Sequence, residues 1–281
     1  MSKKALRRVK SSLMRHRPFN GSIRAVSTGR DYIWPVVSKW LRWINTSPED
    51  SNFTYDLTSR CKITMAASLA SILNREYAEI SRYFDEIESD EAFRRHIEGL
   101  WTTHPHRHRT APTAKIGRRA AWYAIARTVK PAVIVETGVD QGMGAVVLCA
   151  ALARNAGEGH HGKYFGTDIN PQAGYYLKGH FADYGKILYG DSLDSLRSLS
   201  EICDLFINDS DHSADYERAE YEAIKPKLSP TAILLGDNSH VTAELAEFSM
   251  REGRKFIFLQ EEPADHWYRG AGVGISYSTV S

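Results

Sequence analysis

Several features that would assign a chain to a class at once are missing from these 281 residues. There are only three cysteines, Cys61, Cys149 and Cys203, and they stand far apart, so we expect neither a disulfide framework nor a cysteine-rich metal site. The longest uninterrupted apolar run, AVVLCAALA at 145–153, is well short of the ~20 residues that span a bilayer. These absences favour a cytoplasmic protein with no membrane-spanning segment.

An excess of one charge is also missing, because 36 Lys and Arg residues against 34 Asp and Glu residues leave a net charge of +2. This near balance of charges, and the absence of segments in which basic and aromatic residues are interleaved, disfavour nucleic-acid binding. The one local imbalance is MSKKALRRVKSSLMRHR at 1–17, which lacks the apolar core of a secretion signal. This leader is either a solvated tail or, since Leu6, Val9 and Leu13 fall near helical spacing, a segment that touches anionic lipid or a phosphorylated glycan carrier.

A helical N-terminal region and a connector are expected over 21–115, after a basic leader at 1–20. Four apolar residues recur three and four positions apart, as on one buried helix face: Tyr77, Ile80, Phe84 and Ile87. Such helices would cover the mouth of a sheet or form a dimer face, so a homodimer is possible. The segment 102–115 has two prolines and no apolar period, which is typical of a connector, and its three histidines lack the fixed spacing of metal ligands.

Strand-like and helical patterns alternate over 116–281, which we expect to be one domain. The strand-like runs are VIVE (133–136), KYFGTD (163–168), KILYGD (186–191), CDLFINDS (203–210), AILLGDN (232–238), KFIFLQEE (255–262) and GVGISYSTV (272–280). The helical patterns are 118–129, 144–155, 175–184, 192–199, 214–224 and 243–253. This alternation predicts an α/β fold, with a Rossmann-like doubly wound, mostly parallel sheet of seven strands.

The first strand ends in an acid and a glycine turn, VIVETGVDQGMG at 133–144. Its glycines let the backbone turn sharply and approach a ligand, toward which the amides of the next helix point. The spacing G-x-x-x-G-x-G differs from the dinucleotide fingerprint G-x-G-x-x-G, so NAD is not expected. The alternative is a tight strand-to-helix turn that binds no ligand.

Acids also end the following strands. Asp168 ends the second strand, beside the first turn of a doubly wound sheet, where a carboxylate can accept both ribose hydroxyls. Asp191 and Ser192 follow the third strand. Asp191 and Asn170 are equally explained as helix caps or turn formers, which these residue types favour.

The acid, the glycine and the loose glycine turn resemble motif I of the class I S-adenosylmethionine (SAM) methyltransferases. The resemblance implies SAM as cofactor, a ribose contact at Asp168 and adenine contacts at Asp191 and Ser192. It places the remaining SAM contacts at Glu136, Gly138, Asp140, Gly142, Asp209 and Asp211. Asp211 is equally interpreted as a cap of the helix that begins near Ala214.

Oxygen-bearing side chains follow two adjacent strands, Asp209 after the fourth and Asp237 and Asn238 after the fifth. Adjacent strand ends lie about 5 Å apart, so these three oxygens can reach one small cation. Hard oxygen ligands of this kind select Mg²⁺ or a similar divalent cation. The sequence therefore predicts a magnesium site at Asp209, Asp237 and Asn238.

The segment DLFINDSDHSADY (204–216) matches the D-h-x-h-x-D-x-D pattern, with h apolar, of the cation-dependent O-methyltransferases that include the catechol and caffeoyl-coenzyme A enzymes. It departs from that group at His212, where the catechol-type enzymes carry Lys. Asp209 and His212, three residues apart, are more similar to the sugar O-methyltransferases and cephalosporin-hydroxylase-like proteins of macrolide and polysaccharide pathways. The resemblance covers 118–281, while 1–110 is only loosely similar to the helical leaders of bacterial polysaccharide-cluster methyltransferases.

These observations predict Mg²⁺-assisted methyl transfer from SAM to a hydroxyl of a sugar or glycosylated small molecule. A dication lowers the pKa of a bound hydroxyl, and His212 would remove the proton as general base. His240 is a further candidate, as a supporting group or an alternative base. Trp267 and Tyr268, in the loop 261–274, either face the acceptor or pack in the core. A SAM-fold enzyme that does not methylate and a non-catalytic SAM-binding partner protein remain as alternatives.

Overall fold

The computed structural model describes residues 17–49 and 53–278, without the side chains of 17–19 and 109. The two interpretations of the basic leader therefore concern residues that lie, apart from Arg17, outside the described part of the chain. The described residues form two compact units, of which one comprises 17–48 with Asp265–Tyr268 and the other the remaining residues. Each unit is internally packed, and the sheet lies wholly in the second.

The first unit is helical, from α2 (Arg17–Thr28) through a short π-helical stretch (Gly29–Ile33) to α3 (Trp34–Thr46). The Trp267 ring lies edge-on to Trp43, with ring centroids 5.5 Å apart. One aromatic residue of the predicted substrate-facing loop thus packs against α3. Among the described residues, no helix has both the length and the apolar character needed to cross a bilayer.

Three helices precede the sheet in the second unit: α4 (Ser59–Leu73), α5 (Tyr77–Glu88) and α6 (Glu91–Trp101). Side-chain oxygens begin two of them, since Thr58 accepts from the Cys61 amide and Asp90 from the Phe93 amide. The predicted apolar stripe is correct for three of its four residues, which are buried, whereas Tyr77 is 43% exposed because it begins α5. The connector at 102–115 is irregular apart from one turn of 3₁₀ helix at Arg107–Arg109.

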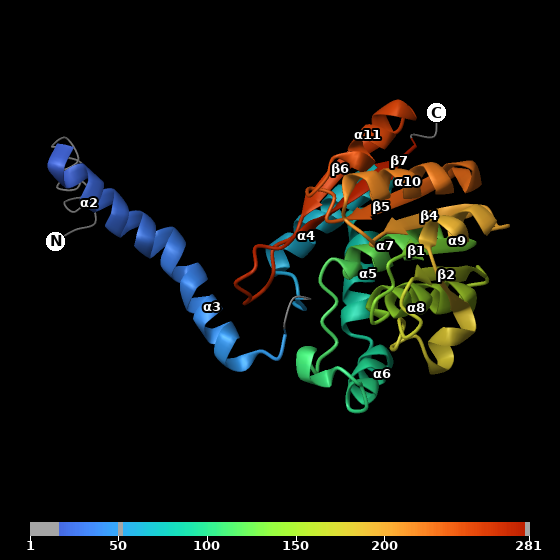
Figure 1. Cartoon of the computed structure of the whole chain (residues 1–281), viewed down its shortest axis with the longest axis horizontal. Coiled ribbons are helices and arrows are strands. Elements are labelled where there is room, and N and C mark those ends of the chain that lie inside the picture. The colour runs from blue at the N-terminus through green and yellow to red at the C-terminus, as the bar shows by residue number, and fades with distance from the viewer. Residues whose placement is uncertain (1–16, 50–52, 279–281) are drawn as a thin grey trace. The chain divides into compact units, whose positions relative to one another are not determined.

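The sheet has seven strands in the order β3-β2-β1-β4-β5-β7-β6 (Figure 1). They are β1 (Val133–Thr137), β2 (Lys163–Asp168), β3 (Gly185–Tyr189), β4 (Cys203–Asn208), β5 (Leu228–Asp237), β6 (Lys255–Gln260) and β7 (Gly272–Tyr277). The first five are parallel, and β7 runs antiparallel to both β5 and β6. The predicted Rossmann-like, mostly parallel seven-stranded sheet is therefore confirmed.

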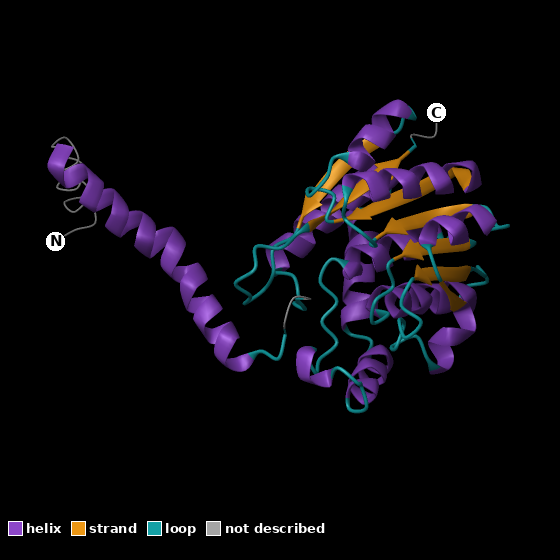
Figure 2. Ribbon diagram, viewed as in Figure 1, coloured by secondary structure: helices purple, strands orange, loops and turns teal. Residues whose placement is uncertain are grey.

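Helices flank this sheet, as Figure 2 shows. They are α7 (Arg119–Val129), α8 (Met143–Gly157), α9 (Ser192–Ser198), α10 (Ala214–Ile224) and α11 (Glu244–Arg251). From β1 the chain adds β2 and β3 toward one edge of the sheet, and from β4 it adds β5 toward the other edge. Right-handed crossovers therefore place α8 and α10 on opposite faces of the sheet. In agreement, α8 packs with α7, while α10 packs with α9 and α11.

The junction between β1 and β4 is the point where the strand order reverses, and ligands bind open α/β sheets in the crevice at this point.

The helix predicted before β3 is not formed: residues 175–184 contain only a 3₁₀ segment, Gly179–Tyr184. Gly179 has φ +56°, a left-handed conformation that an α-helix cannot contain. The prediction failed because the apolar period crosses this glycine.

Candidate active site

The turn after β1 lies directly against the end of β4. The amide of Gly138 donates to the Thr167 carbonyl at 2.9 Å, and the Asp209 amide donates to the Thr137 carbonyl at 3.0 Å. A Cβ added at Gly138 would lie 2.0 Å from the Asp209 carbonyl oxygen, and Gly138 has φ +78°. The neighbouring backbone therefore requires glycine at this position, independently of any ligand.

We expect Gly138→Ala to lower the free energy of unfolding by about 3 kcal/mol or more, because left-handed strain and a backbone collision act together. Gly159→Ala is the matched control, since Gly159 has φ +87° but open space around it, and should cost about 1 kcal/mol. Urea unfolding of both variants measures the difference. Equal losses would show that β4 does not constrain the turn.

Glu136 is buried beneath this turn, 1% exposed, and accepts a hydrogen bond from the Tyr164 hydroxyl at 2.6 Å. A Cβ at Gly144 would lie 2.1 Å from Glu136 Oε1, so that glycine makes room for the carboxyl group. Burial raises the pKa of Glu136 to about 7. Glu136 thus supports the turn from below and does not line the cavity described next.

This raised pKa predicts a pH dependence of stability. Between about pH 4.5 and 7 the folded protein holds a proton on Glu136 that the unfolded chain has lost, so the unfolding free energy falls as pH rises through this window. At about 1.4 kcal/mol per pKa unit the total fall is about 3–4 kcal/mol. The Glu136→Gln variant should lack this pH dependence. Urea unfolding at several pH values should therefore show a difference in unfolding free energy between the two proteins that changes with pH. Parallel curves would contradict the prediction.

A cavity of about 250 Å³ opens at the carboxyl ends of β1, β4 and β5. Six of the predicted site residues line it: Gly138, Asp140, Asp209, His212, Asp237 and Asn238. These residues come from three separate loops, which the parallel strands bring to one edge of the sheet. The structure therefore joins the predicted cofactor turn and the predicted metal site in a single pocket.

Two further predicted residues shape the turn without lining this cavity. Asp168 accepts from the amide of Asp140 at 2.8 Å and from that of Asn170, also at 2.8 Å, so its carboxylate holds the turn to the end of β2. Gly142 precedes α8 with φ +90°, and a Cβ there would lie 2.9 Å from the Gly174 Cα. Both residues fix the backbone that faces the pocket.

Three predicted residues have local partners outside the cavity. Asp191 caps α9 by accepting from the Leu193 amide at 2.8 Å, as its alternative interpretation expected. Buried Ser192 contacts the Tyr216 hydroxyl at 2.9 Å and also donates to Glu220. Asp211 accepts from the Ser213 amide at 3.0 Å, in the turn before α10. Contacts of these residues with SAM remain predictions.

The possible metal ligands Asp209, His212 and Asp237 offer one ligand atom each within 4.8 Å of one another. His212 Nε2 lies 3.9 Å from Asp209 Oδ1 and 3.2 Å from Asn238 Nδ2. On the other side of the ring, His212 Nδ1 lies 3.5 Å from buried Glu217. The Glu217 carboxylate raises the pKa of His212, and Glu217 itself accepts from the Thr242 hydroxyl. The imidazole thus lies between a carboxylate and the pocket.

Two arginines that the sequence did not identify as site residues enter the same pocket. Arg118 donates from Nε and Nη2 to the two oxygens of Asp237, the Nη2 contact measuring 2.5 Å. Arg119 Nη2 lies 3.8 Å from Asp209 Oδ2. Burial alone would raise the pKa of Asp237, but Arg118 outweighs burial and holds that pKa below its usual range. Burial and the adjacent Asp237 raise the pKa of Asp209 well above its usual value.

A second carboxylate holds Arg118 in place. Glu261, at the end of β6, accepts from the Arg118 amide at 3.1 Å and from the Ala271 amide at 3.0 Å. The Tyr55 hydroxyl donates to it as well, and Glu261 Oε1 lies 3.7 Å from Arg118 Nη1. Arg118 is therefore a fixed part of the site and not a surface side chain.

A signal for these arginines was present in the sequence. Arg118 and Arg119 stand at the start of α7, where the positive end of the helix dipole disfavours cations. Two adjacent arginines before the apolar helix AAWYAIA imply that external acids stabilise them. Those acids lie 90 or more residues away, so the sequence alone could not name them.

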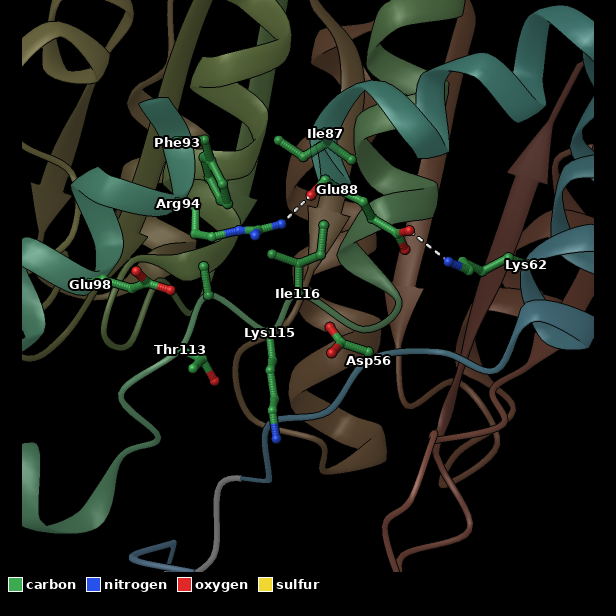
Figure 3. Close-up of a pocket in the computed structure, with 11 residues that line it drawn as sticks. Asp56, Lys62, Ile87, Glu88, Phe93, Arg94, Glu98, Thr113, Lys115 and Ile116 are labelled. Atoms are coloured by element: carbon green, nitrogen blue, oxygen red, sulfur yellow. Dashed lines mark hydrogen bonds and ion pairs between the residues drawn. The ribbon is translucent and has the colours of Figure 1, made fainter. Parts of the chain in front are cut away.

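A larger cavity, of about 460 Å³, lies elsewhere in the second unit among α4, α5, α6 and the connector (Figure 3). Two of its basic side chains contact the same residue. Lys62 forms an ion pair with the Glu88 carboxylate at 2.6 Å, and Arg94 donates to the Glu88 carbonyl at 2.7 Å. Lys115 and Glu98 point in different directions (Figure 3). No predicted site residue lines this cavity.

Comparison with known proteins agrees with the site. Residues 135–239 match a family described as a methyltransferase domain. No curated protein matches the chain. Similar solved structures include an SAH-bound methyltransferase of Podospora anserina, at 18% identity and TM-score 0.48, covering 68% of this chain and 88% of that one.

Two other similar structures are those of O-methyltransferases. TomG of Streptomyces achromogenes, in complex with SAM, is 16% identical, with TM-score 0.48 and coverage of 68% and 91% of the two chains. The Bacillus cereus enzyme, in complex with SAH, is 12% identical, with TM-score 0.47 and coverage of 77% and 97%. The matched residues run from within β1 to just past the end of β5, and this match to a methyltransferase domain supports the SAM-dependent methyltransferase that the sequence predicts.

Proposed function

We propose that this protein transfers the methyl group of SAM to a hydroxyl oxygen of a small acceptor, with a sugar or glycosylated compound as the preferred class. The observation that carries the proposal is the position of His212 on the same cavity as Gly138 and Asp140 of the cofactor turn. A base beside the methyl donor is what an alcohol needs, because almost none of it is ionised at neutral pH. The sugar class is supported only by the Asp209 and His212 spacing.

The chemical character of the cavity suits SAM. The cofactor carries a cationic sulfonium and an ammonium group, and we assign these to Asp140 of the cofactor turn, because the other two acids of the cavity, Asp237 and Asp209, face Arg118 and Arg119. Asp168, at the end of β2, lies beside the turn, and we propose that its carboxylate binds the ribose hydroxyls. These residues would bind and orient the donor, and binding in line with the acceptor is the main contribution of a protein to such a displacement.

We propose His212 as the general base. With Nδ1 toward Glu217, the lone pair of Nε2 faces the pocket, where it now accepts from the Asn238 amide. The acceptor hydroxyl would take the place of that amide and give its proton to Nε2. The new O–CH₃ bond forms as the S–CH₃ bond breaks, leaving S-adenosylhomocysteine and a methyl ether.

The predicted magnesium ion does not fit the residues as they are arranged. Asp209 and Asp237 have suitable oxygens, but both oxygens of Asp237 receive hydrogen bonds from Arg118, and Arg119 faces Asp209. A divalent cation at Asp209, Asp237 and Asn238 would have to displace a buried guanidinium. We therefore assign no step to Mg²⁺.

The test is incubation with methyl-labelled SAM and a panel of glycosides, phenols and small hydroxylated natural products, with and without chelator. Label in a methyl ether supports the proposal, and the acceptor that takes it defines the class. Binding of SAM without transfer to any acceptor would instead favour a non-catalytic partner protein. A product other than a methyl ether would favour a SAM-fold enzyme of the cephalosporin-hydroxylase-like kind.

A cytoplasmic location is part of the same proposal. All three cysteines are unpaired and buried, as a reducing compartment allows. A homodimer and contact of the basic leader with an anionic membrane surface remain predictions from the sequence. Size-exclusion chromatography and vesicle flotation would test them separately.

A further inference from the structure

The predicted metal site already contains positive charge. Arg118 spans both oxygens of Asp237, a side chain that is fully buried, and its own side chain is only 13% exposed. Arg119, 19% exposed, faces the second predicted ligand, Asp209. Two guanidinium groups thus lie at the ends of β4 and β5, where a cation-dependent enzyme would place one dication.

We infer that Arg118, assisted by Arg119, takes the place of the divalent cation in this enzyme, so that Asp237 binds a guanidinium and methyl transfer needs no metal. The inference rests on the proposed function, because it assigns the charge that assists the same acceptor hydroxyl. It differs from the expectation drawn from the sequence, in which Asp209, Asp237 and Asn238 hold Mg²⁺.

The position of Arg118 is fixed before any ligand binds. Its backbone amide is bonded to Glu261, and Glu261 is held by Tyr55 and the Ala271 amide. A bidentate arginine–carboxylate pair also fixes the plane of the guanidinium. A cation that displaced Arg118 from Asp237 would leave a buried guanidinium with Glu261 alone, at 3.7 Å. Such an exchange is costly because an uncompensated buried charge is strongly unfavourable.

The arrangement leaves one nitrogen of Arg118 for the acceptor. Nε and Nη2 are used by Asp237, while Nη1 makes no hydrogen bond to the described residues and has only the longer ion-pair contact with Glu261, at 3.7 Å. Arg118, His212 and Asn238 line the same cavity. A hydroxyl there could accept from Nη1 and donate to His212, and a nearby positive charge stabilises the oxyanion that develops as the proton leaves. Arginine thereby supplies the electrostatic part of what a metal would supply.

The test is titration with Mn²⁺, which prefers the same oxygen ligands as Mg²⁺ and is observed by electron paramagnetic resonance. We expect no saturable Mn²⁺ binding that depends on Asp237 in the wild-type protein. Arg118→Ala should gain one such site, tighter than any wild-type binding by at least about tenfold, and the added change Asp237→Asn should remove it. Arg118→Gln, which keeps a hydrogen bond to Asp237, is the second variant if Arg118→Ala fails to fold.

Wild-type protein also gives a readout that needs no variant. Mn²⁺ at Asp237 would broaden the ring signals of His212 in histidine-labelled protein, and we expect no broadening. Broadening of His212 with stoichiometric Mn²⁺, or folded Arg118 variants that gain no site, would overturn the inference. SAH binding is measured in the same samples, so a protein that binds neither SAH nor SAM would contradict the proposed function independently of the Mn²⁺ result.

Discussion

His212→Ala should lower the rate of methyl transfer by about 10²- to 10⁴-fold while leaving SAM affinity within about twofold. The expected loss is large because, among the described residues, His212 is the only histidine that lines the cavity formed by the cofactor turn. The Asn238 amide contacts its Nε2 at 3.2 Å, while its Nδ1 makes no hydrogen bond to the described residues and lies 3.5 Å from Glu217. Initial rates with the acceptor identified from the panel, and calorimetry with SAH, measure the two quantities separately.

His240→Ala is the matched control. His240 follows Asn238 closely in sequence but is exposed, lies against Phe258 and does not line the cavity. Its removal should leave the rate of methyl transfer near that of the wild type. If both variants lost activity equally, or if His212→Ala lost SAM binding together with turnover, His212 would be structural and the base would have to be sought elsewhere.

Asp237→Ala should lower the free energy of unfolding by about 3–5 kcal/mol, the range found when one partner of a buried ion pair is removed. The loss arises less from the missing attraction than from Arg118, which would remain buried without its bidentate partner. Glu261, at 3.7 Å, compensates only in part. Urea unfolding of the wild type and the variant gives the difference directly.

An exposed pair supplies the comparison. Asp194 and Arg197 lie 3.5 Å apart with side chains 82% and 63% exposed, and Asp194→Ala should cost less than about 1 kcal/mol. If Asp237→Ala were as mild, the guanidinium would be able to leave the site freely. A stable Asp237→Ala protein would therefore also weaken the case that Arg118 is fixed at the cation position.

The fold was predictable where local patterns decide structure. The continuous apolar runs at β1 and β4 are typical of strands covered on both faces, and the Ala-rich stretch at 144–155 could only be a buried helix. The six residues 179–184 show the limit, because a hydrophobic period continued across Gly179 without forming an α-helix. Backbone conformation at one glycine overrode the pattern.

The site was predictable to the extent that parallel strands end at one edge. Asp209 and Asp237 follow adjacent strands, so their proximity followed from strand order once the alternation of strands and helices was recognised. His212 was found through its spacing from Asp209. The pairing of Asp237 with Arg118 could not be found this way, because 119 residues separate the two and no local pattern links them.

The sequence by itself predicted the class of chemistry: a glycine turn after a buried strand, and acids after the strands that follow, form a sheet edge that through its resemblance to methyltransferase motif I indicates a charged cofactor. Only the tertiary structure decided what neutralises those acids. Composition and spacing record which side chains are available, whereas the partner of a buried charge is set by which elements pack together. Here the start of α7 packs against the end of β5, and that contact places an arginine where oxygen ligands alone had suggested a metal ion.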